Sequence, residues 1–315
     1  MHDVIIVGGG AAGLTSAIYA SRRNLKTLVI SQDTGGQAAT TPEVENYPGF
    51  TEMVDGFVLM QNFKKQAEKF GTEFITSEVT AIEKVDGKFS VKTPDKTYDA
   101  ESVILAFGLT HRHLGVVGEE DKIGKGVSYC ATCDGPLYRG KTVAVVGGGA
   151  SAIETALFMS EITKQVYIIH RRDQYRGEEV MVKRLNEAKN IEQVLNSQTT
   201  AIKGQDVVEV IEVKNDDGKT REIKVDGVFV EIGLEVKSDF IKGLVDLDER
   251  NQIKISAVNE TNCPGIYAAG DVTDIVYKQI VISAGEGAKA ALSAYNYLQK
   301  KKGLTPSVDW GKKKA

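Results

Sequence analysis

The sequence predicts an α/β protein with two domains of the same design, and three observations support this prediction. An apolar, β-branched run, DVIIV at residues 3–7, passes through a glycine-rich turn into a segment of helical composition. The same order of strand, glycine turn and helix returns at TVAVV, residues 142–146. A chain of 315 residues is long enough to form two domains, each with its own hydrophobic core.

The composition is that of an ordinary globular chain, with 42% hydrophobic and 26% charged residues. The formal net charge of −4 is too small to indicate nucleic acid as a partner. Lysines gather at residues 300–302 and 312–314, which we interpret as a solvated helix end and tail. No run approaches the roughly 18 apolar residues of a transmembrane helix, so we expect no membrane partner.

The N-terminal residues MHDVIIVGGG enter a strand pattern by the third position, without the basic and apolar regions of a secretory signal. We therefore expect a cytoplasmic, reducing location. In such a compartment, two cysteines at CxxC spacing are more often catalytic or metal-binding than a structural disulfide.

The two glycine turns have the spacing of dinucleotide-binding turns. The first has Gly8, Gly10 and Gly13; the second has Gly147 and Gly149, with Ala152 at the third position. The first glycine permits the turn, the second allows a pyrophosphate to approach the backbone, and the third position must be small for close helix packing. Two such turns predict two Rossmann-like domains and hence two dinucleotides.

The residues after the second strand of each domain indicate which nucleotide binds. After QVYIIH, residues 165–170, the basic residues Arg171, Arg172 and Arg176 gather where an adenosine ribose is expected. Arginines there suit the 2′-phosphate of NADPH, whereas NAD sites usually have an acidic residue. The alternative is an ordinary solvated basic loop.

The first domain shows a different pattern at the same place. Ser31 follows KTLVI, and Asp33 is a poor substitute for the usual acidic residue. A later strand, IYAAGDV at 266–272, leads into Gly270 and Asp271, and a carboxylate there can accept a hydrogen bond from a ribityl hydroxyl. Together with the first glycine turn, this segment indicates FAD.

The order of these motifs predicts that one domain is inserted into the other. We expect a discontinuous FAD domain at 1–115 and 245–315, with a β-meander at 79–98 and a helix at 283–299. The NADPH domain would occupy 116–244.

The segment GVSYCATCDGPL, residues 126–137, contains two of the three cysteines, Cys130 and Cys133, followed by Asp134. Three interpretations are open from the residues themselves: half of a metal site, a structural disulfide, or a redox-active dithiol.

The chain resembles the low-molecular-weight thioredoxin reductases, class II pyridine nucleotide-disulfide oxidoreductases, over nearly its whole length. The resemblance rests on the GGGAAG turn, TGGQ at 34–37, VENYPGF at 44–50, and above all on CATC just before the second glycine turn. HRRDQYR at 170–176, YAAGDV at 267–272 and KQIVISAGEGAKAA at 278–291 continue it. It implies two three-layer (ββα) nucleotide-binding domains and a homodimer.

The resemblance also implies a reaction. NADPH reduces FAD, FAD reduces the Cys130–Cys133 disulfide, and the dithiol reduces thioredoxin or a thioredoxin-like protein. Cys133 would face the flavin, and Cys130 would attack the partner's disulfide. Asp134 would act as acid and base, although an aspartate here also suits a turn before Gly-Pro.

A zinc site would need further ligands, and only Cys263 and four scattered histidines remain, so we expect no metal. By resemblance, flavin contacts fall on Gly13, Gln37, Asn46, Asp271, Gln279 and Ile280. The expected NADPH contacts are Gly149, Ser151, Ala152, Arg171, Arg172 and Arg176. The family rotates one domain against the other, and segments near 113–118 and 232–238 are the candidate hinges.

Some positions depart from the family pattern. Ala150 and Thr155 replace polar and acidic residues that are common there, and GLEVKSDF at 233–240 and AFG at 106–108 also differ. Two alternatives stay open: a flavin disulfide reductase of the same fold with another electron donor or acceptor, and a flavoprotein that serves only as a binding or sensing module.

Overall fold

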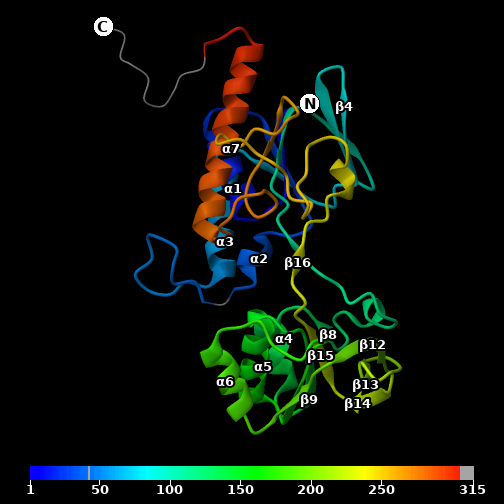
Figure 1. The fold of residues 1–315 in the computed structure, drawn as a ribbon. Helices are drawn as coiled ribbons and strands as arrows, with labels where there is room; N and C mark the ends of the chain where they lie inside the picture. The colour runs from blue at the N-terminus through cyan, green and yellow to red at the C-terminus, as the bar shows by residue number, and fades with distance from the viewer. Residues whose placement is uncertain (42, 306–315) are drawn as a thin grey trace. The chain divides into compact units, whose positions relative to one another are not determined.

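The computed structural model describes residues 1–41 and 43–305, so the lysines at 312–314 lie outside the described residues. The chain forms two compact units (Figure 1). Unit 1 comprises Met1–Thr110 and Val236–Ala315, and unit 2 comprises His111–Glu235.

These boundaries differ from the expected 115/116 and 244/245, for reasons of local bonding. The backbone N–H groups of Leu114 and Gly115 donate to the Glu119 carboxylate, which ties this segment to unit 2. At the other boundary, Val236 and Ile241 are buried in a core of unit 1, so that segment belongs with unit 1.

Unit 1 contains a seven-stranded sheet in which five strands are parallel and two form an antiparallel meander. The first half of the long strand β6 pairs with the meander, and its second half pairs with β1 and β17. The parallel strands, in spatial order, are β3 (Glu73–Thr76), β2 (Thr27–Ser31), β1 (His2–Val7), β6 (Thr97–Leu105) and β17 (Ile266–Ala268); the meander adds β5 (Lys88–Lys92) and β4 (Ala81–Val85).

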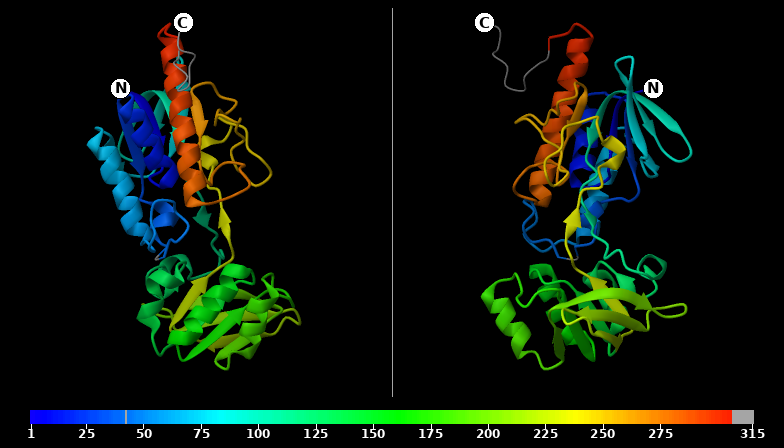
Figure 2. Two further views of the ribbon diagram at one scale, coloured as in Figure 1. Left: turned by 90° about the vertical axis from the view of Figure 1, so that its left-hand side faces the viewer. Right: turned by 45° about the vertical axis from the view of Figure 1, so that its right-hand side comes forward.

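Successive side chains of β1 point to opposite faces of the sheet and so contribute to two different cores of unit 1. Val4 and Ile6 pack in the core that includes helices α1 (Ala11–Arg22) and α7 (Ile280–Lys301), whereas Ile5 and Val7 pack in the core that includes the meander. Figure 2 shows α1 and α7 side by side in unit 1. Helices α2 (Gly36–Ala39) and α3 (Gly56–Lys69) form a further cluster with Leu14 of α1. The helix predicted at 283–299 is therefore present and longer at both ends.

Unit 2 repeats this plan. Its five parallel strands are ordered β11 (Ile191–Val194), β10 (Gln165–Ile169), β9 (Thr142–Val146), β15 (Gly227–Val230) and β8 (Val127–Ser128). Val143 and Val145 pack with α5 (Ala150–Ile162) and α6 (Glu179–Glu187). Ala144 and Val146 pack with the meander β12 (Ser197–Lys203), β13 (Val210–Asn215) and β14 (Thr220–Lys224). The predicted fold class, two three-layer nucleotide-binding domains with one inserted in the other, is confirmed.

The two chain connections between the units pair with each other. β7 (Thr110–His111) and β16 (Leu234–Glu235) form a two-stranded ribbon, and Arg112 N–H donates to the Gly233 carbonyl. Short 3-10 turns follow at η1 (Glu120–Lys122) and η3 (Asp239–Ile241). Across residues 1–41 and 43–305, none of the helices has the length and apolar character that crossing a membrane requires.

Candidate functional site: two glycine turns and a cysteine pair

The cysteine pair of unit 2 is a disulfide. Cys130 and Cys133 are bonded, with their Cα atoms 5.3 Å apart, around the start of α4 (Ala131–Asp134). Cys130 Sγ accepts the Cys133 N–H at 3.3 Å and lies 3.4 Å from Thr132 Oγ1. Cys130 is half-buried, whereas Cys133 is exposed. Both groups near Cys130 Sγ are hydrogen-bond donors, and such donors stabilise a thiolate when the disulfide is reduced.

Asp134 ends α4, and its backbone N–H donates to the Cys130 carbonyl at 3.1 Å. The chain continues into η2 (Gly135–Tyr138), where a Cβ at Gly135 would come within 3.0 Å of Met159 and Phe158. Gly135 therefore allows the segment that follows the disulfide to pack directly against α5. Asp134 itself is half-buried.

Sequence reasoning missed a buried carboxylate that supports the residues before Cys130. Glu119 is fully buried, and it accepts the N–H groups of Leu114 and Gly115 and the hydroxyl of Tyr129, at 2.7–2.8 Å. Burial raises the pKa of Tyr129, and the hydrogen bond to Glu119 raises it further. The Tyr129 ring stacks on His113, which also contacts Glu120. In the sequence, only the position of Glu119 directly after Gly118 could have indicated this role, and a glutamate after a glycine is common on solvated turns.

The first glycine turn joins β1 to α1 through backbone contacts that exclude side chains. Gly8 has φ +110°, and a Cβ at Gly13 would lie 2.0 Å from the Gly8 carbonyl oxygen. Gly10 is the residue before α1, has no side-chain cap, and would project a Cβ into space with its nearest neighbour 3.9 Å away. The turn thus leaves the first N–H groups of α1 available to an anion.

The segment after β2 closes over this turn. Ser31 Oγ accepts the Gly9 N–H at 2.8 Å, and Gly35 N–H donates to the Gly9 carbonyl at 2.7 Å. Asp33 accepts the Gly36 N–H at 2.9 Å, so its carboxylate shapes the loop. Gln37 follows in α2. Ser31 therefore serves the turn itself, at the position where an acidic ribose ligand is common.

Two predicted flavin contacts from distant parts of the chain meet in the structure. Asn46 Nδ2 donates to Gln279 Oε1 at 3.2 Å, and Gln279 is the residue before α7, which begins at Ile280. The other predicted contact lies by the same helix, because Ser283 Oγ donates to Asp271 Oδ1 at 3.2 Å. These contacts bring Asn46, Asp271 and Gln279 to the N-terminal end of α7.

Gly270 and Asp271 lie close to the first glycine turn. A Cβ at Gly270, where φ is +78°, would lie 2.9 Å from the Cβ of Ala12 in α1. Burial raises the pKa of Asp271, while Lys278 and the Ser283 hydrogen bond act in the opposite direction. Lys278 Nζ donates to the backbone carbonyls of Asp271 and Thr273. A half-buried carboxylate next to the turn is a suitable acceptor for ligand hydroxyl groups.

The second glycine turn joins β9 to α5 and has the same uncapped helix start. Gly149 has no side-chain cap, and a Cβ there would meet nothing within 4 Å. The first turns of α1 and α5, both fully described, contain no acidic residue. Ser151 and Ala152 lie in the first turn of α5, and Ala152 is fully buried. Both turns therefore fit a pyrophosphate, which needs free N–H groups and no competing carboxylate.

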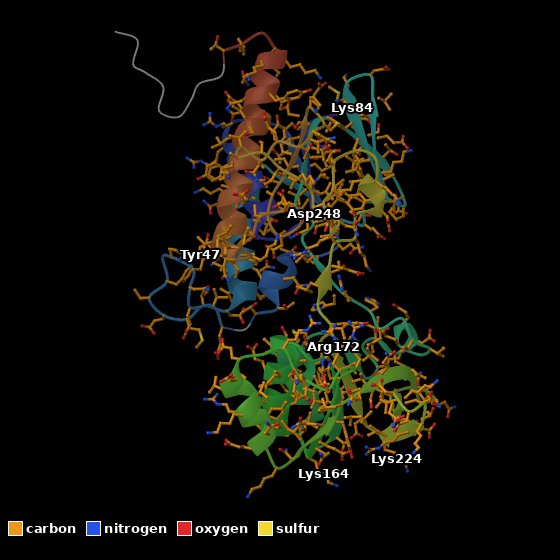
Figure 3. The ribbon with its side chains drawn as sticks, in the orientation of Figure 1. Tyr47, Lys84, Lys164, Arg172, Lys224 and Asp248 are labelled. Atoms are coloured by element: carbon orange, nitrogen blue, oxygen red, sulfur yellow. A yellow bond between two sulfur atoms is a disulfide. The ribbon has the colours of Figure 1, made fainter. Side chains whose placement is uncertain are left out.

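A basic loop follows β10 and is tied to this turn. Arg176 N–H donates to the Gly148 carbonyl at 2.7 Å, and His170 Nε2 lies 3.1 Å from the Gln174 carbonyl. Arg171, Arg172 and Arg176 are exposed, and no ion pair within the described residues engages them (Arg172 is labelled in Figure 3). Three guanidinium groups without a carboxylate partner are available to a phosphate.

The same edge of unit 2 contains a half-buried glutamate that sequence reasoning did not single out. Glu231 follows β15, its N–H donates to the Val146 carbonyl at 2.7 Å, and its Oε1 accepts Thr155 Oγ1 at 3.1 Å. Burial raises the pKa of Glu231 to about 7; the Thr155 hydrogen bond lowers it, and Glu154 raises it. Thr155, noted above as a departure from the family pattern, is thus the partner of this carboxyl group.

No cluster of three or more histidine, cysteine, aspartate or glutamate side chains suited to a metal ion occurs within residues 1–41 and 43–305. The third cysteine, Cys263, is free and lies 3.7 Å from Lys84 Nζ. The chemistry of the site therefore rests on two uncapped glycine turns and a cysteine pair. Together these features define a class: disulfide oxidoreductases that use a flavin and a nicotinamide nucleotide.

Comparison with known proteins gives the family. Residues 2–289 match the pyridine nucleotide-disulphide oxidoreductase family, to which the chain belongs. Within it, the chain is 40% identical to a thioredoxin reductase of Mycolicibacterium smegmatis, over 95% of this chain and 97% of that protein. A crystal structure of Lactococcus lactis thioredoxin reductase in its FR conformation has a TM-score of 0.81 and 37% identity, covering 95% of this chain and 100% of that one.

Other relatives differ in the activity they are named for. A glucosaminate ammonia-lyase of Pseudomonas fluorescens is 40% identical, over 94% of this chain and 95% of that protein. A ferredoxin-flavin thioredoxin reductase of Clostridium acetobutylicum has a TM-score of 0.54 and 33% identity, covering 96% of this chain and 98% of that one. Overall similarity leaves the electron donor open, so the site residues must decide between donors.

Proposed function

We propose that the protein is an NADPH-dependent thioredoxin reductase that holds FAD in unit 1 and NADPH in unit 2. One observation carries the choice of donor: three exposed arginines without ion-pair partners follow β10, beside an uncapped glycine turn. The Cys130–Cys133 disulfide in the same unit carries the choice of reaction.

The residues present fit both nucleotides. In unit 1, we propose that Gly8, Gly10 and Gly13 bind the FAD pyrophosphate and that Asp271 accepts from a flavin hydroxyl. Gln37, Asn46, Gly270, Gln279 and Ile280 complete the proposed flavin site. In unit 2, the proposed NADPH contacts are Gly147, Gly149, Ser151, Ala152, Arg171, Arg172 and Arg176. When bound, the flavin supplies two-electron transfer between the nucleotide and the disulfide.

The dithiol then exchanges with a protein disulfide. The Cys130 thiolate attacks one sulfur of the partner's disulfide, forming a mixed disulfide and releasing the other sulfur as a thiolate. Cys133 next attacks Cys130 Sγ, which restores the internal disulfide and releases the partner's second thiol. We propose that Asp134 takes the proton from Cys133 and delivers it to the departing sulfur. Two electrons leave the protein, and the partner gains two thiols.

Thioredoxin is the proposed partner because thioredoxin reductases match the chain over nearly their whole length and the chain carries a Cys130–Cys133 disulfide. A ferredoxin-fed relay is the second candidate, favoured by the likeness to the Clostridium acetobutylicum structure. The unpaired arginines argue for the nucleotide, since a relay fed by ferredoxin has no 2′-phosphate to bind. A homodimer and a cytoplasmic location remain predictions, and size-exclusion chromatography with light scattering tests the first.

An anaerobic titration followed by flavin absorbance tests the proposal. NADPH, added to the purified protein, should bleach the flavin, and oxidised thioredoxin should restore the absorbance. NADH at the same concentration should bleach it far less. If neither nucleotide bleaches the flavin and reduced ferredoxin does, the donor assignment is wrong.

The Cys130→Ser variant separates the two halves of the relay. It should still be bleached by NADPH, because the flavin and nucleotide residues are intact, but it should not pass electrons to thioredoxin. A protein that purifies without flavin absorbance would instead contradict the assignment of unit 1.

A further inference from the structure

Glu231 lies at the carboxyl end of the unit 2 sheet, and β9 separates it from the strand that leads into the arginine loop. The strand order places β10, with its basic loop, on one side of β9, and β15 on the other. In open α/β sheets, dinucleotides bind across the carboxyl ends of the strands at the point where the strand order reverses. That point here lies between β9 and β15, and Glu231 directly follows β15.

Backbone contacts fix Glu231 next to the glycine turn. Its N–H donates to the Val146 carbonyl, and its own carbonyl oxygen lies 2.2 Å from where a Cβ at Gly147 would be. The arginine loop is attached at the neighbouring glycine, through Arg176 N–H and the Gly148 carbonyl. A dinucleotide with its pyrophosphate at the turn and its 2′-phosphate on the arginines therefore extends its other half toward β15.

One carboxylate oxygen of Glu231, Oε2, has no hydrogen-bond donor among the described residues. Its Oε1 accepts from Thr155, whereas its Oε2 has no hydrogen-bond partner within residues 1–41 and 43–305. The Oε2 atom is unpartnered but is not fully buried, so a ligand can reach it. A half-buried carboxylate oxygen that lacks a partner but is reachable suits a ligand donor group.

The equivalent position in unit 1 is not acidic. Ala106 N–H donates to the Val7 carbonyl, and the Ala106 carbonyl oxygen lies 2.3 Å from a Cβ at Gly8, the same contacts that Glu231 makes in unit 2. Nothing in the shared turn geometry therefore requires a carboxyl group here. Glu231 is a feature of unit 2 alone.

We propose that Glu231 binds the nicotinamide riboside half of the nucleotide, accepting a hydrogen bond from its hydroxyl or carboxamide donors. This inference rests on the proposed NADPH site and adds the residue that recognises the other half. The carboxylate form is the acceptor, so binding favours the deprotonated group. Affinity should therefore rise as pH rises through about 7, where Glu231 loses its proton.

Other charged and ionisable groups lie near the turn, so the experiment needs a control ligand. Glu154 acts on Glu231 from α5, and His170 packs over Gly148 on the arginine side. The 2′-phosphate of the nucleotide itself titrates near pH 6. 2′,5′-ADP has this phosphate and the adenosine but lacks the nicotinamide riboside. The ratio of NADP⁺ affinity to 2′,5′-ADP affinity therefore separates the effect of Glu231 from that of the groups on the adenosine side.

Isothermal titration calorimetry of the oxidised, flavin-loaded protein tests the proposal without turnover. For the unaltered protein, the affinity ratio should rise about tenfold between about pH 6 and about pH 8. In Glu231→Gln, NADP⁺ should bind about tenfold more weakly at the higher pH, the ratio should lose its pH dependence, and 2′,5′-ADP should bind as before. In Thr155→Val, the midpoint of the pH dependence should move upward, because the Thr155 hydrogen bond lowers the pKa of Glu231.

The outcomes separate the two proposals. Unchanged NADP⁺ affinity in Glu231→Gln, or an equal loss for both ligands, overturns the role of Glu231, since the first shows no contact and the second a disturbed turn. A ratio whose pH dependence persists in Glu231→Gln shows that another group causes it and also overturns the role. If the unaltered protein does not bind 2′,5′-ADP, the arginine site is wrong, and this inference falls with it.

Discussion

The two glycine turns have the same backbone geometry but different surroundings. In each, the chain after the second strand returns to donate an N–H to the middle glycine: Gly35 to Gly9 in unit 1, and Arg176 to Gly148 in unit 2, both at 2.7 Å. In unit 1 the returning loop contains glycines and a serine, whereas in unit 2 it contains three arginines and His170. On the proposed function, the turn is a general pyrophosphate site and the returning loop selects the nucleotide.

The largest effect is expected from a substitution at the third position of the first turn, where the two turns differ. In Gly13→Ala, the new Cβ would lie 2.0 Å from the Gly8 carbonyl oxygen, so the turn must distort. We expect loss of nearly all bound FAD, measured as flavin absorbance per protein. Unit 2 already has Ala152 at this position, so Ala152→Gly should change NADPH affinity little; a large effect there would contradict the equivalence of the turns.

The next effect concerns the returning loops. Replacing Arg172 and Arg176 with alanine removes two guanidinium groups that have no ion-pair partner in the described chain. NADPH should bind about a hundredfold more weakly, at about 1.4 kcal/mol for each lost contact, while NADH affinity stays nearly constant. The measurement is the KM for each nucleotide with thioredoxin as acceptor. Equal losses for both nucleotides would show that the loop supports the fold and does not read the 2′-phosphate.

A smaller effect contrasts Glu231 with its counterpart Ala106. The pKa of Glu231 is raised to about 7 in the folded protein, so the folded state holds a proton that the unfolded state releases near pH 4.5. Stability contributed by this group is therefore present at low pH and is lost as pH rises from about 4.5 through about 7.

Glu231→Gln removes this pH dependence. At about pH 8 the variant should be more stable than the unaltered protein by about 2 kcal/mol, and near pH 4.5 the two should be alike. Urea denaturation of the nucleotide-free protein at both pH values measures the difference. A constant offset at the two pH values would show that the glutamine acts through packing alone.

The smallest effect concerns the hydroxyl that serves the first turn. Ser31→Ala leaves the Gly9 N–H without its acceptor, which we expect to weaken FAD binding about fivefold, equivalent to about 1 kcal/mol. The flavin released during dialysis measures it. Ser31→Thr, which keeps the hydroxyl, should restore binding; if it does not, steric fit at Gly9 is the cause and not the hydrogen bond.

The elements that the sequence predicted are those defined by neighbours in the chain. Both glycine turns and the apolar strands before them are local patterns, and each is present in the structure. The contact between Asn46 and Gln279 joins residues 233 positions apart, and its residues were found only through the resemblance.

Other features depended on strand register, which no local pattern reports. Glu231 meets Thr155 because β15 pairs with β9 so that Val230 lies opposite Val146. Glu119 is buried because Leu114, Gly115 and Tyr129 converge on it, although on a sequence it resembles any surface glutamate. The boundaries of the units also differ from the predicted ones, because they depend on hydrogen bonds and packing between residues distant in the sequence.

The ribbon of β7 and β16 has a consequence for how this chain can be modified. Because the strands that enter and leave unit 2 are hydrogen-bonded neighbours, the inserted segment begins and ends at nearly the same place. Segments with adjacent ends can be exchanged between proteins without cutting the host's sheet. A homologous segment inserted between Thr110 and Val236 would therefore leave the sheet of unit 1 whole, and on the proposed function such a chimera would change the nucleotide site and keep the flavin site.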